Sequence, residues 1–460
     1  MKSKIESFEV TKGGKSGDLL SEIHQDKKFK IGFLACGYKY NLNMLNNNNH
    51  KTISTNLIKL KNMINLKSSI LGKILMACIT SLILISFQSC NSQSSKQEYK
   101  VAAYYWPAYH DEPRWRTFFD GKEGEWEIIK NAVPQYEGHR LPRIPEWGYQ
   151  DETDPKVMEQ KINAAVSHGV NVFVFDWYWY EGKPFLEETI NEGFLNAQNN
   201  DEIDFYIMWA NHDAPTVWDK RRSHEWETIW TAEVDRKNFD LIADRVISQY
   251  MKHPSYLKID GKPVFSIYEL GTLIKGLGGI QQTRDALDSF REKVKKAGFP
   301  GLHLQAILWS AIPEISFPGD NSKTQNNTVE ALGVNSLTNY QFVHVSSPVD
   351  EYTEWADKAV ANWPVWDEEF SVPFFPHVSV DWDPNPRYYD YHPNIKNGVN
   401  PENFKLYLEK AKTYLDARPD QYKLITINSW NEWSEGSYLE PDTDHGMEYL
   451  EAVREVFGSK

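Results

Sequence analysis

Cysteine is nearly absent from this chain. Its 460 residues include 3 cysteines, Cys36, Cys78 and Cys90, so none follows residue 90. Everything beyond that point can form no internal disulfide, offers no thiolate ligand to zinc and has no thiol nucleophile. The roughly 360 residues that follow are enough to bury one large core without cross-links.

Long hydrophobic runs are also missing, apart from one short apolar segment, Ile74 to Phe87, preceded by Lys73. A basic flank before a short apolar run is typical of an export signal and not of a membrane span. Because the run ends just before Cys90, we expect residues 63–90 to be a lipoprotein-type signal peptide, with Cys90 lipidated. A buried N-terminal helix is the alternative.

The segments around this signal predict the domain organisation. Residues 1–62 are polar and rich in lysine and asparagine, and we expect a spurious or disordered extension, with the true start at Met63 or Met76. Residues 91–98 read as a polar linker, and residues 99–460 as the catalytic domain. The expected product is an exported lipoprotein, periplasmic or at the outer membrane or cell surface, which contacts the membrane through its lipid anchor only.

Positive charge is in deficit, with 50 Lys and Arg against 64 Asp and Glu and a net charge of -14. This balance argues against nucleic acid as a partner and against a polybasic membrane contact. Aromatic residues, by contrast, make up 14% of the chain, with 17 Trp. Such a content suggests a ligand cleft lined by rings. No cofactor is indicated, and we expect a monomer.

Eight β-rich runs alternate with amphipathic segments from Tyr99 onward. This alternation predicts a (β/α)8 TIM barrel, a single large α/β domain. A doubly wound open sheet is the alternative, but no glycine-rich phosphate loop follows the first run. The expected strands are 101–106, 170–177, 205–210, 263–268, 302–309, 334–340, 372–380 and 424–430. The expected helices are 155–168, 183–198, 235–252, 281–297, 351–363, 401–417 and 446–456.

Aromatic, amide and acidic residues gather where these strands end. One such residue at a strand end is more often core than ligand platform, but a TIM barrel brings all the carboxyl ends of its strands to one mouth. We therefore expect these residues to bind substrate. They are Tyr105, Trp106, Asp176, Trp177, Tyr178, Trp179, Asn211, His212, Trp309, Tyr340, Asp381, Trp382, Asn431, Trp433 and Glu440.

The last strand ends in two glutamates, Glu432 and Glu435, set between tryptophans. Ser434 and Gly436 favour a helical turn there, in which the two Cβ atoms lie about 5–6 Å apart. Carboxyl groups about 5–5.5 Å apart are typical of retaining glycosidases, so we expect a catalytic pair and retention. The plainer interpretation is two solvated charges after a strand. If the second carboxylate lies elsewhere, Asp176 and Glu269 are the replacements.

Metal sites are not expected. Asp381-Trp382-Asp383-Pro384-Asn385 has the alternating oxygens of a calcium loop, but proline stands at its sixth position and histidine at its twelfth. His110, His212 and His377 lie near predicted strand ends, without the close histidine pair that would support zinc.

The strand-eight motif resembles that of glycoside hydrolase family 99. Its residues are Trp430-Asn431-Glu432-Trp433-Ser434-Glu435-Gly436, followed by Glu440-Pro441. Three other segments resemble the bacterial family 99-like group, sometimes named as glycosyltransferases: Tyr104-Tyr105-Trp106-Pro107, Phe175-Asp176-Trp177-Tyr178-Trp179 and Trp209-Ala210-Asn211-His212.

The resemblance implies roles for the glutamate pair. Glu432 would deprotonate the 2-hydroxyl of the sugar, which attacks its own anomeric carbon, and Glu435 would protonate the leaving oxygen and then activate water. Ser434 stands where family 99 proper typically has histidine.

Three functions follow as hypotheses. The first is a glycoside hydrolase that cleaves polysaccharide or glycan chains. The second is a glycosyltransferase of surface polysaccharide assembly, although sugar-nucleotide donors are cytosolic and this chain carries an expected export signal. The third is a non-catalytic glycan-binding lipoprotein, which would have no need of both Glu432 and Glu435.

Overall fold

The structure is a computed structural model that describes residues 98–319, 322–346 and 349–458. The expected extension, signal peptide, Cys90 and nearly all of the linker lie outside these residues. Among the residues described, no helix is both long and apolar enough to cross a bilayer.

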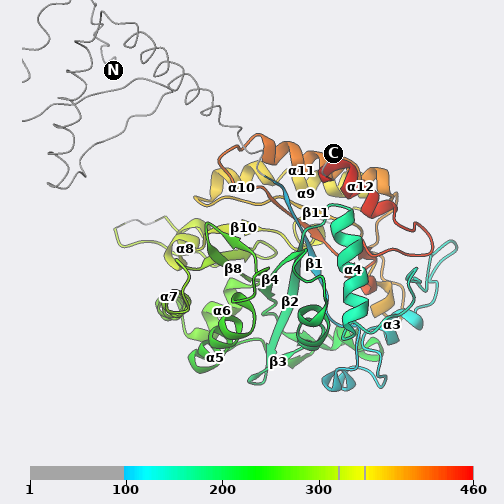
Figure 1. The fold of residues 1–460 in the computed structure, drawn as a ribbon, viewed down its shortest axis with the longest axis horizontal. Helices are drawn as coiled ribbons and strands as arrows, with labels where there is room; N and C mark the ends of the chain where they lie inside the picture. The colour runs from blue at the N-terminus through cyan, green and yellow to red at the C-terminus, as the bar shows by residue number, and fades with distance from the viewer. Residues whose placement is uncertain (1–97, 320–321, 347–348, 459–460) are drawn as a thin grey trace, which may run out of the picture. The chain divides into compact units, whose positions relative to one another are not determined.

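Eight parallel strands form one sheet that closes on itself (Figure 1). Neighbouring strands follow the order β10, β9, β8, β4, β2, β1, β12, β11. A parallel bridge between Leu337 of β10 and Phe374, just before β11, joins the two ends. The TIM barrel prediction is therefore confirmed. The strands are β1 (Lys100–Tyr105), β2 (Val172–Tyr180), β4 (Asp204–Trp209), β8 (Lys262–Ile267), β9 (His303–Ile307), β10 (Ser336–Thr338), β11 (His377–Ser379) and β12 (Leu424–Asn428).

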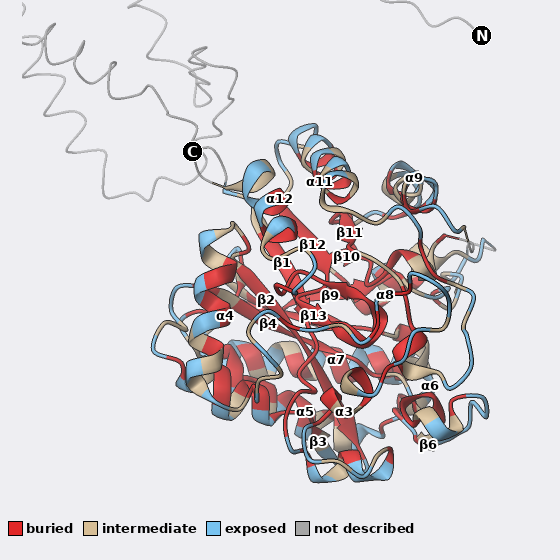
Figure 2. Ribbon diagram, turned by 90° about the vertical axis from the view of Figure 1, so that its right-hand side faces the viewer, coloured by how far each residue is buried: buried red, intermediate tan, exposed pale blue. Residues whose placement is uncertain are grey.

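Helices surround the strands, buried on the side that faces the barrel and exposed on the other (Figure 2). Local signals set several boundaries: Asp154 and Asn400 accept backbone N–H bonds at the starts of α4 and α11, each with proline as the first helical residue. The helices are α3 (Trp126–Lys130), α4 (Pro155–Ser167), α5 (Arg236–Val246), α6 (Leu270–Leu277), α7 (Ile280–Lys296), α8 (Gln325–Leu332), α9 (Tyr352–Val360), α10 (Trp363–Glu369), α11 (Pro401–Asp416) and α12 (Glu448–Phe457).

Short elements extend the barrel, most of them near the carboxyl ends of the strands, whereas Lys258–Ile259 pairs at the amino end of β8. The two-stranded pieces are β3 (Lys183–Phe185) on β2, β7 (Lys258–Ile259) on β8, β5 (Ala214–Pro215) with β6 (Thr228–Trp230), and β13 (Asn431–Glu432) with β14 (Ser437–Tyr438). The short helical turns are η2 (Pro113–Thr117), η3 (Thr189–Gly193), η4 (Phe194–Asn196), η5 (Thr216–Trp218), η6 (Lys220–Arg222), η7 (Ile247–Met251), η8 (Phe342–His344), η9 (Asn385–Arg387) and η10 (Trp433–Glu435).

Two expected elements, at 183–198 and 372–380, differ most from the structure. The predicted helix 183–198 is instead the strand β3 followed by η3 and η4, because Glu181 and Gly182 adopt positive φ and turn the chain back onto β2. The predicted strand 372–380 shrinks to β11. Pro373 and Pro376 precede it, and proline cannot donate a hydrogen bond to a neighbouring strand.

Candidate active site

A cavity of about 600 Å³ opens at the carboxyl ends of the strands. Its walls combine rings with carboxylates, as the sequence led us to expect for this end of the barrel. Nine of the predicted site residues line it: Trp106, Asp176, Tyr178, His212, Trp309, Tyr340, Trp382, Glu432 and Glu435.

The chain after β12 folds into a compact turn that presents both glutamates. Asn431–Glu432 pairs with Ser437–Tyr438 as a small hairpin, and the residues between them form the 3-10 turn η10. Gly436 ends this turn at φ 73°, a left-handed conformation that glycine adopts without steric cost. The helical turn predicted for the pair is therefore present. The strand-seven loop also holds it, since Asp383 N–H donates to Glu435 O at 2.6 Å.

One guanidinium, that of Arg387, joins the two glutamates. Its Nη1 forms an ion pair with Glu435 Oε1, and its Nη2 lies 3.2 Å from Glu432 Oε2. A third carboxylate, Glu125, lies 3.4 Å from the same Nη2 and also accepts from Ser434 Oγ at 3.0 Å. Three carboxyl groups thus share one guanidinium.

Tyr340 connects Glu432 to a further carboxyl group. Its hydroxyl lies 2.6 Å from Glu432 Oε1 and 2.7 Å from Asp176 Oδ2. A phenol has one hydrogen, so a carboxyl proton must supply the other of these two hydrogen bonds. Burial raises the pKa of Asp176 well above its usual range, and Arg387 lies on the Glu432 side. We therefore assign this proton to Asp176.

Both glutamates of the pair are harder to ionise than usual. Burial raises the pKa of Glu432 well above its ordinary value, the charge of Glu435 adds to this, and Arg387 opposes it. Burial likewise raises the pKa of Glu435, again opposed by Arg387. Donors occupy both oxygens of Glu432, from Tyr340 and Arg387. By contrast, Glu435 Oε2 is buried without a hydrogen-bond partner among the described residues, and it is the atom free to carry a proton.

Three aromatic residues predicted to bind substrate lie outside the cavity. Tyr105 donates to Glu152 Oε1 at 3.0 Å, Trp177 Nε1 to Glu187 at 2.8 Å, and Trp179 Nε1 to Asn238 at 3.3 Å. Alternate residues of a strand face opposite sides, so these three point towards the surrounding helices while Asp176 and Tyr178 point inward. Their predicted contact with substrate is corrected accordingly.

The two predicted amide contacts are structural. Asn211 bonds the backbone of Glu269 through both its side-chain oxygen and nitrogen. Asn431 does the same for the backbone of Trp106, at 2.8 and 2.9 Å. These side chains tie neighbouring strand ends together and do not line the cavity.

Trp433 and Glu440 also lie behind the turn. Trp433 stacks on Tyr438 with ring centroids 3.9 Å apart and donates to Glu440 at 2.9 Å. Glu440 and Glu152 both pair with the fully buried Lys161 of α4, at 2.6 and 2.5 Å. Glu440 therefore anchors the hairpin to a helix.

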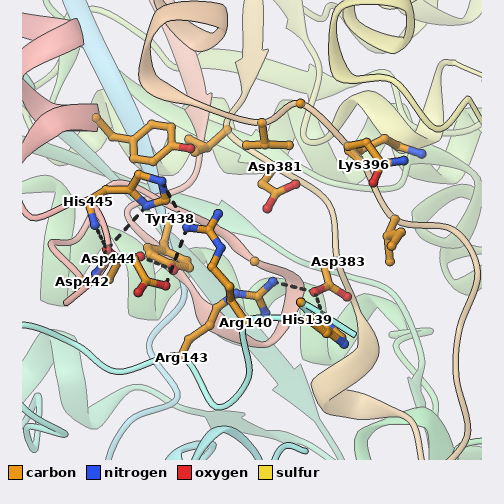
Figure 3. A pocket seen from close by; sticks show the side chains of 18 of the residues that line it. His139, Arg140, Arg143, Asp381, Asp383, Lys396, Tyr438, Asp442, Asp444 and His445 are labelled. Atoms are coloured by element: carbon orange, nitrogen blue, oxygen red, sulfur yellow. Dashed lines mark hydrogen bonds and ion pairs between the residues drawn. The ribbon is translucent and has the colours of Figure 1, made fainter. Parts of the chain in front are cut away.

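Asp381 faces a second, smaller cavity of about 190 Å³ (Figure 3). Arg140, Arg143 and Lys396 also line it. Burial raises the pKa of Asp381 to about 7, although Arg143 acts against this. Its neighbour Trp382 turns the other way, into the larger cavity.

Sequence reasoning missed several residues at the cavity. Arg387 is the most consequential, and Tyr268, Trp218, Tyr388 and His344 also line the walls. Arg387 ends η9 in the loop considered for calcium, and the carboxylate Asp383 of that loop accepts from His139 and Arg143 at 2.8 and 2.7 Å. The sequence Asp-Trp-Asp-Pro-Asn-Pro-Arg after strand seven could have indicated Arg387, because this arginine follows three side chains that accept hydrogen bonds.

Comparison with known proteins identifies the family and supports the fold. A sequence model of the family described as "Glycosyltransferase WbsX" matches residues 101–453. Proteins named WxcX from two strains of Xanthomonas campestris pv. campestris are each 26% identical over 367 residues, which cover 77% of this chain and 49% of theirs. The chain thus spans about half the length of the curated relatives it matches.

A solved GH99 endo-alpha-mannosidase from Bacteroides thetaiotaomicron superimposes with a TM-score of 0.52 at 15% identity, covering 78% of this chain and 96% of that chain. At this identity the likeness concerns the fold. The resemblance to the family 99-like group drawn from the motifs is confirmed, and the chain belongs to the family described as Glycosyltransferase WbsX.

Proposed function

We propose that this protein is a glycoside hydrolase that cleaves glycan or polysaccharide chains with retention of configuration. The observation that carries the proposal is the buried Glu432–Arg387–Glu435 arrangement in a ring-lined cavity. Burying several carboxylates beside one another is costly, and strongly perturbed carboxyl groups in a cleft are a mark of acid–base chemistry. Rings such as Trp106, Trp309 and Trp382 offer flat surfaces for the C–H faces of sugars.

In this proposal the two glutamates have different tasks. Glu435 carries the proton on its free Oε2 and donates it to the leaving glycosidic oxygen. Although burial raises the pKa of Glu432, Tyr340 and Arg387 bond its two oxygens, and in its ionised form it removes the proton of the sugar 2-hydroxyl, which attacks the anomeric carbon. Water then attacks the anomeric carbon and breaks its bond to the 2-oxygen, while Glu435 accepts a proton from the water and Glu432 returns its proton to the 2-oxygen. The family 99 resemblance supports this route, and α-mannans are the first substrates to test.

A transferase that uses a sugar nucleotide is the second candidate, because the family bears a glycosyltransferase description. The charge of the cavity favours the hydrolase. Among the described lining residues, two carry a positive charge, Lys275 and Arg387, and both already pair with glutamates. Six acidic residues line the same cavity. Asp176 and Glu435 hold protons in this proposal, and the other four, Asp213, Glu233, Glu269 and Glu432, would repel a diphosphate.

The test is leaving-group dependence. We expect Glu435→Gln to lower turnover of natural glycans by about 10²–10⁴-fold, since proton donation is lost. An activated aryl glycoside, whose leaving group needs no proton, should lose much less. Equal loss on both substrates would contradict the assigned role. Retained glycan binding with no turnover by wild type under any condition would instead favour the non-catalytic alternative.

The role of Glu432 has its own test. If it acts on the 2-hydroxyl, a 2-deoxy substrate resists wild-type enzyme, and Glu432→Gln is about as damaging as Glu435→Gln because the pair acts as a unit. A 2-fluoro sugar that forms an adduct on Glu432 would show an ordinary nucleophile instead.

We also propose that the protein is exported and anchored through lipidated Cys90, and that it acts as a monomer. The short apolar run before Cys90 supports the first part. Mass spectrometry of the native membrane fraction should find a lipidated N-terminal cysteine at residue 90. A mature N-terminus well upstream of it would refute the anchor.

A further inference from the structure

A histidine and two glutamates lie close together outside the large cavity, and they are separate from Glu432 and Glu435. His110 lies in the loop after β1, Glu112 caps the start of η2, and Glu188 immediately precedes η3. One nitrogen or oxygen atom from each lies within 4.8 Å of the others. None of the three lines the large cavity.

The hydrogen bonds around His110 leave one ring nitrogen unused. The Thr189 hydroxyl lies 3.2 Å from Pro107 O and 3.1 Å from His110 Nδ1. Its single hydrogen goes to the carbonyl, so Nδ1 must carry a hydrogen and donate it to Thr189. In the neutral ring the lone pair is then on Nε2, which is buried and has no hydrogen-bond partner among the described residues. A hydrogen bond to one ring nitrogen that orients the other is the usual arrangement in metal-binding histidines.

The spacing suits two ligands of one ion. His110 Nε2 lies 3.6 Å from Glu188 Oε2, beyond hydrogen-bond distance. Ligand atoms about 2.0–2.2 Å from a tetrahedral Zn²⁺ are about 3.4 Å apart. Small side-chain movements would therefore bring both atoms onto one cation.

The cluster holds two carboxyl groups and one imidazole. Neither Glu112 nor Glu188 forms an ion pair with lysine or arginine in residues 98–319, 322–346 and 349–458. The nearby guanidinium of Arg114 turns to Glu181 at 3.2 Å. Glu112 Oε1 accepts the Arg114 backbone N–H at 2.8 Å, and Leu186 also contributes a backbone hydrogen bond to this carboxyl group.

We propose that His110, Glu112 and Glu188 bind a divalent cation, Zn²⁺ in the first place. One imidazole with two carboxylates suits Zn²⁺ better than Ca²⁺ or Mg²⁺, which prefer oxygen ligands alone. The ion would join the loop after β1 to the segment before η3. Trp115 of η2 packs on the cavity residue Trp106, with centroids 6.2 Å apart, so the ion stiffens this wall. The proposed metal site does not depend on the proposed hydrolysis.

The test uses zinc alone on the full-length chain after treatment with a chelator. Wild type should retain one more equivalent of zinc after dialysis than His110→Gln or Glu188→Ala. Its Tm should rise by about 3–5 °C when free Zn²⁺ exceeds its dissociation constant a hundredfold. Glu188 is half exposed, so its replacement leaves the fold intact and keeps the comparison sound.

Two matched variants serve as controls. Glu192→Ala removes an exposed glutamate of η3, and His224→Gln an exposed histidine; both should bind zinc as wild type does. Zinc held by other groups, the three cysteines included, is common to all variants. The same zinc content and Tm rise in Glu188→Ala as in wild type would overturn the site. A rise with Ca²⁺ and none with Zn²⁺ would overturn the choice of metal.

Discussion

Arg387 sets the charge balance of the cavity. Its side chain is 11% exposed and contacts Glu125, Glu432 and Glu435. Removing one partner from a buried ionic cluster is far more damaging than breaking a surface pair, because the remaining charges are left without compensation. Arg387 also opposes the rise in the pKa of both Glu432 and Glu435.

Replacing Arg387 should therefore shift the pH dependence of catalysis. In Arg387→Met the pKa of Glu432 rises further, so its ionised form appears only at higher pH. We expect the acid limb of the kcat/KM profile to move up by about one pH unit or more. Arg245→Met, which removes an ion pair to Glu187 away from the large cavity, should leave the profile in place. An unshifted limb in Arg387→Met would contradict the role of this arginine.

Asp381 makes a separate prediction about stability. Its pKa in the folded protein, about 7, lies above its unfolded value near 3.9. The folded state thus holds the proton more tightly, and the stability that this provides is lost as pH rises through that window. Asparagine cannot ionise, so Asp381→Asn should gain stability relative to wild type by about 1–3 kcal/mol between pH 4 and pH 8.

Urea unfolding of both proteins at the two pH values measures this gain. Part of the Asp381 side chain is open to the smaller cavity, so we expect the lower part of that range. A difference in unfolding free energy that stays constant with pH would show that Asp381 ionises normally.

The conformation of the turn η10 depends on Gly436. A Cβ atom built there would lie 2.6 Å from Arg143 Nη2 and 3.2 Å from Asp381 Oδ2. Arg143 cannot withdraw freely, because it pairs with Asp383 at 2.7 Å. The glycine therefore allows both the left-handed backbone and the close approach of the strand-seven loop.

Gly436→Ala should destabilise the protein by more than the backbone cost alone. Gly148 is the matched control, since it has a similar φ of 75° and 4 Å of clear space among the described atoms. Alanine at Gly148 should cost about 1–2 kcal/mol, and at Gly436 about 1 kcal/mol more, with reduced turnover as Glu435 shifts. Urea unfolding and kcat measure both effects. Equal costs at the two glycines would refute the crowding.

The elements and site residues differ in how well the sequence predicts them. All eight barrel strands and the glutamate turn were predictable, because hydrophobic runs and the motif after β12 mark them directly. The face of β2 was not, because a strand buried on both sides is aromatic on both, so Trp177 and Tyr178 look alike. Arg387 was missed for another reason: its partners are distant in sequence, and only the closed barrel brings them together.

In the whole molecule, acidic and aromatic residues together line one cavity. The chain carries a net charge of -14, and the cavity shares this excess of carboxylates. An acidic, ring-lined mouth on a closed barrel suits a neutral glycan better than a sugar nucleotide. We therefore expect the protein to hydrolyse glycans without any activated sugar donor.

Isotope incorporation tests this claim most directly. Bacterial polysaccharides, α-mannans included, are incubated with the protein in H₂¹⁸O without sugar nucleotides, and the products are analysed by mass spectrometry. We predict one ¹⁸O atom at each new reducing end, with the retained anomer forming first by NMR, and no such product from Glu435→Gln. Products that form only when a sugar nucleotide is added, and that lack ¹⁸O, would contradict the account.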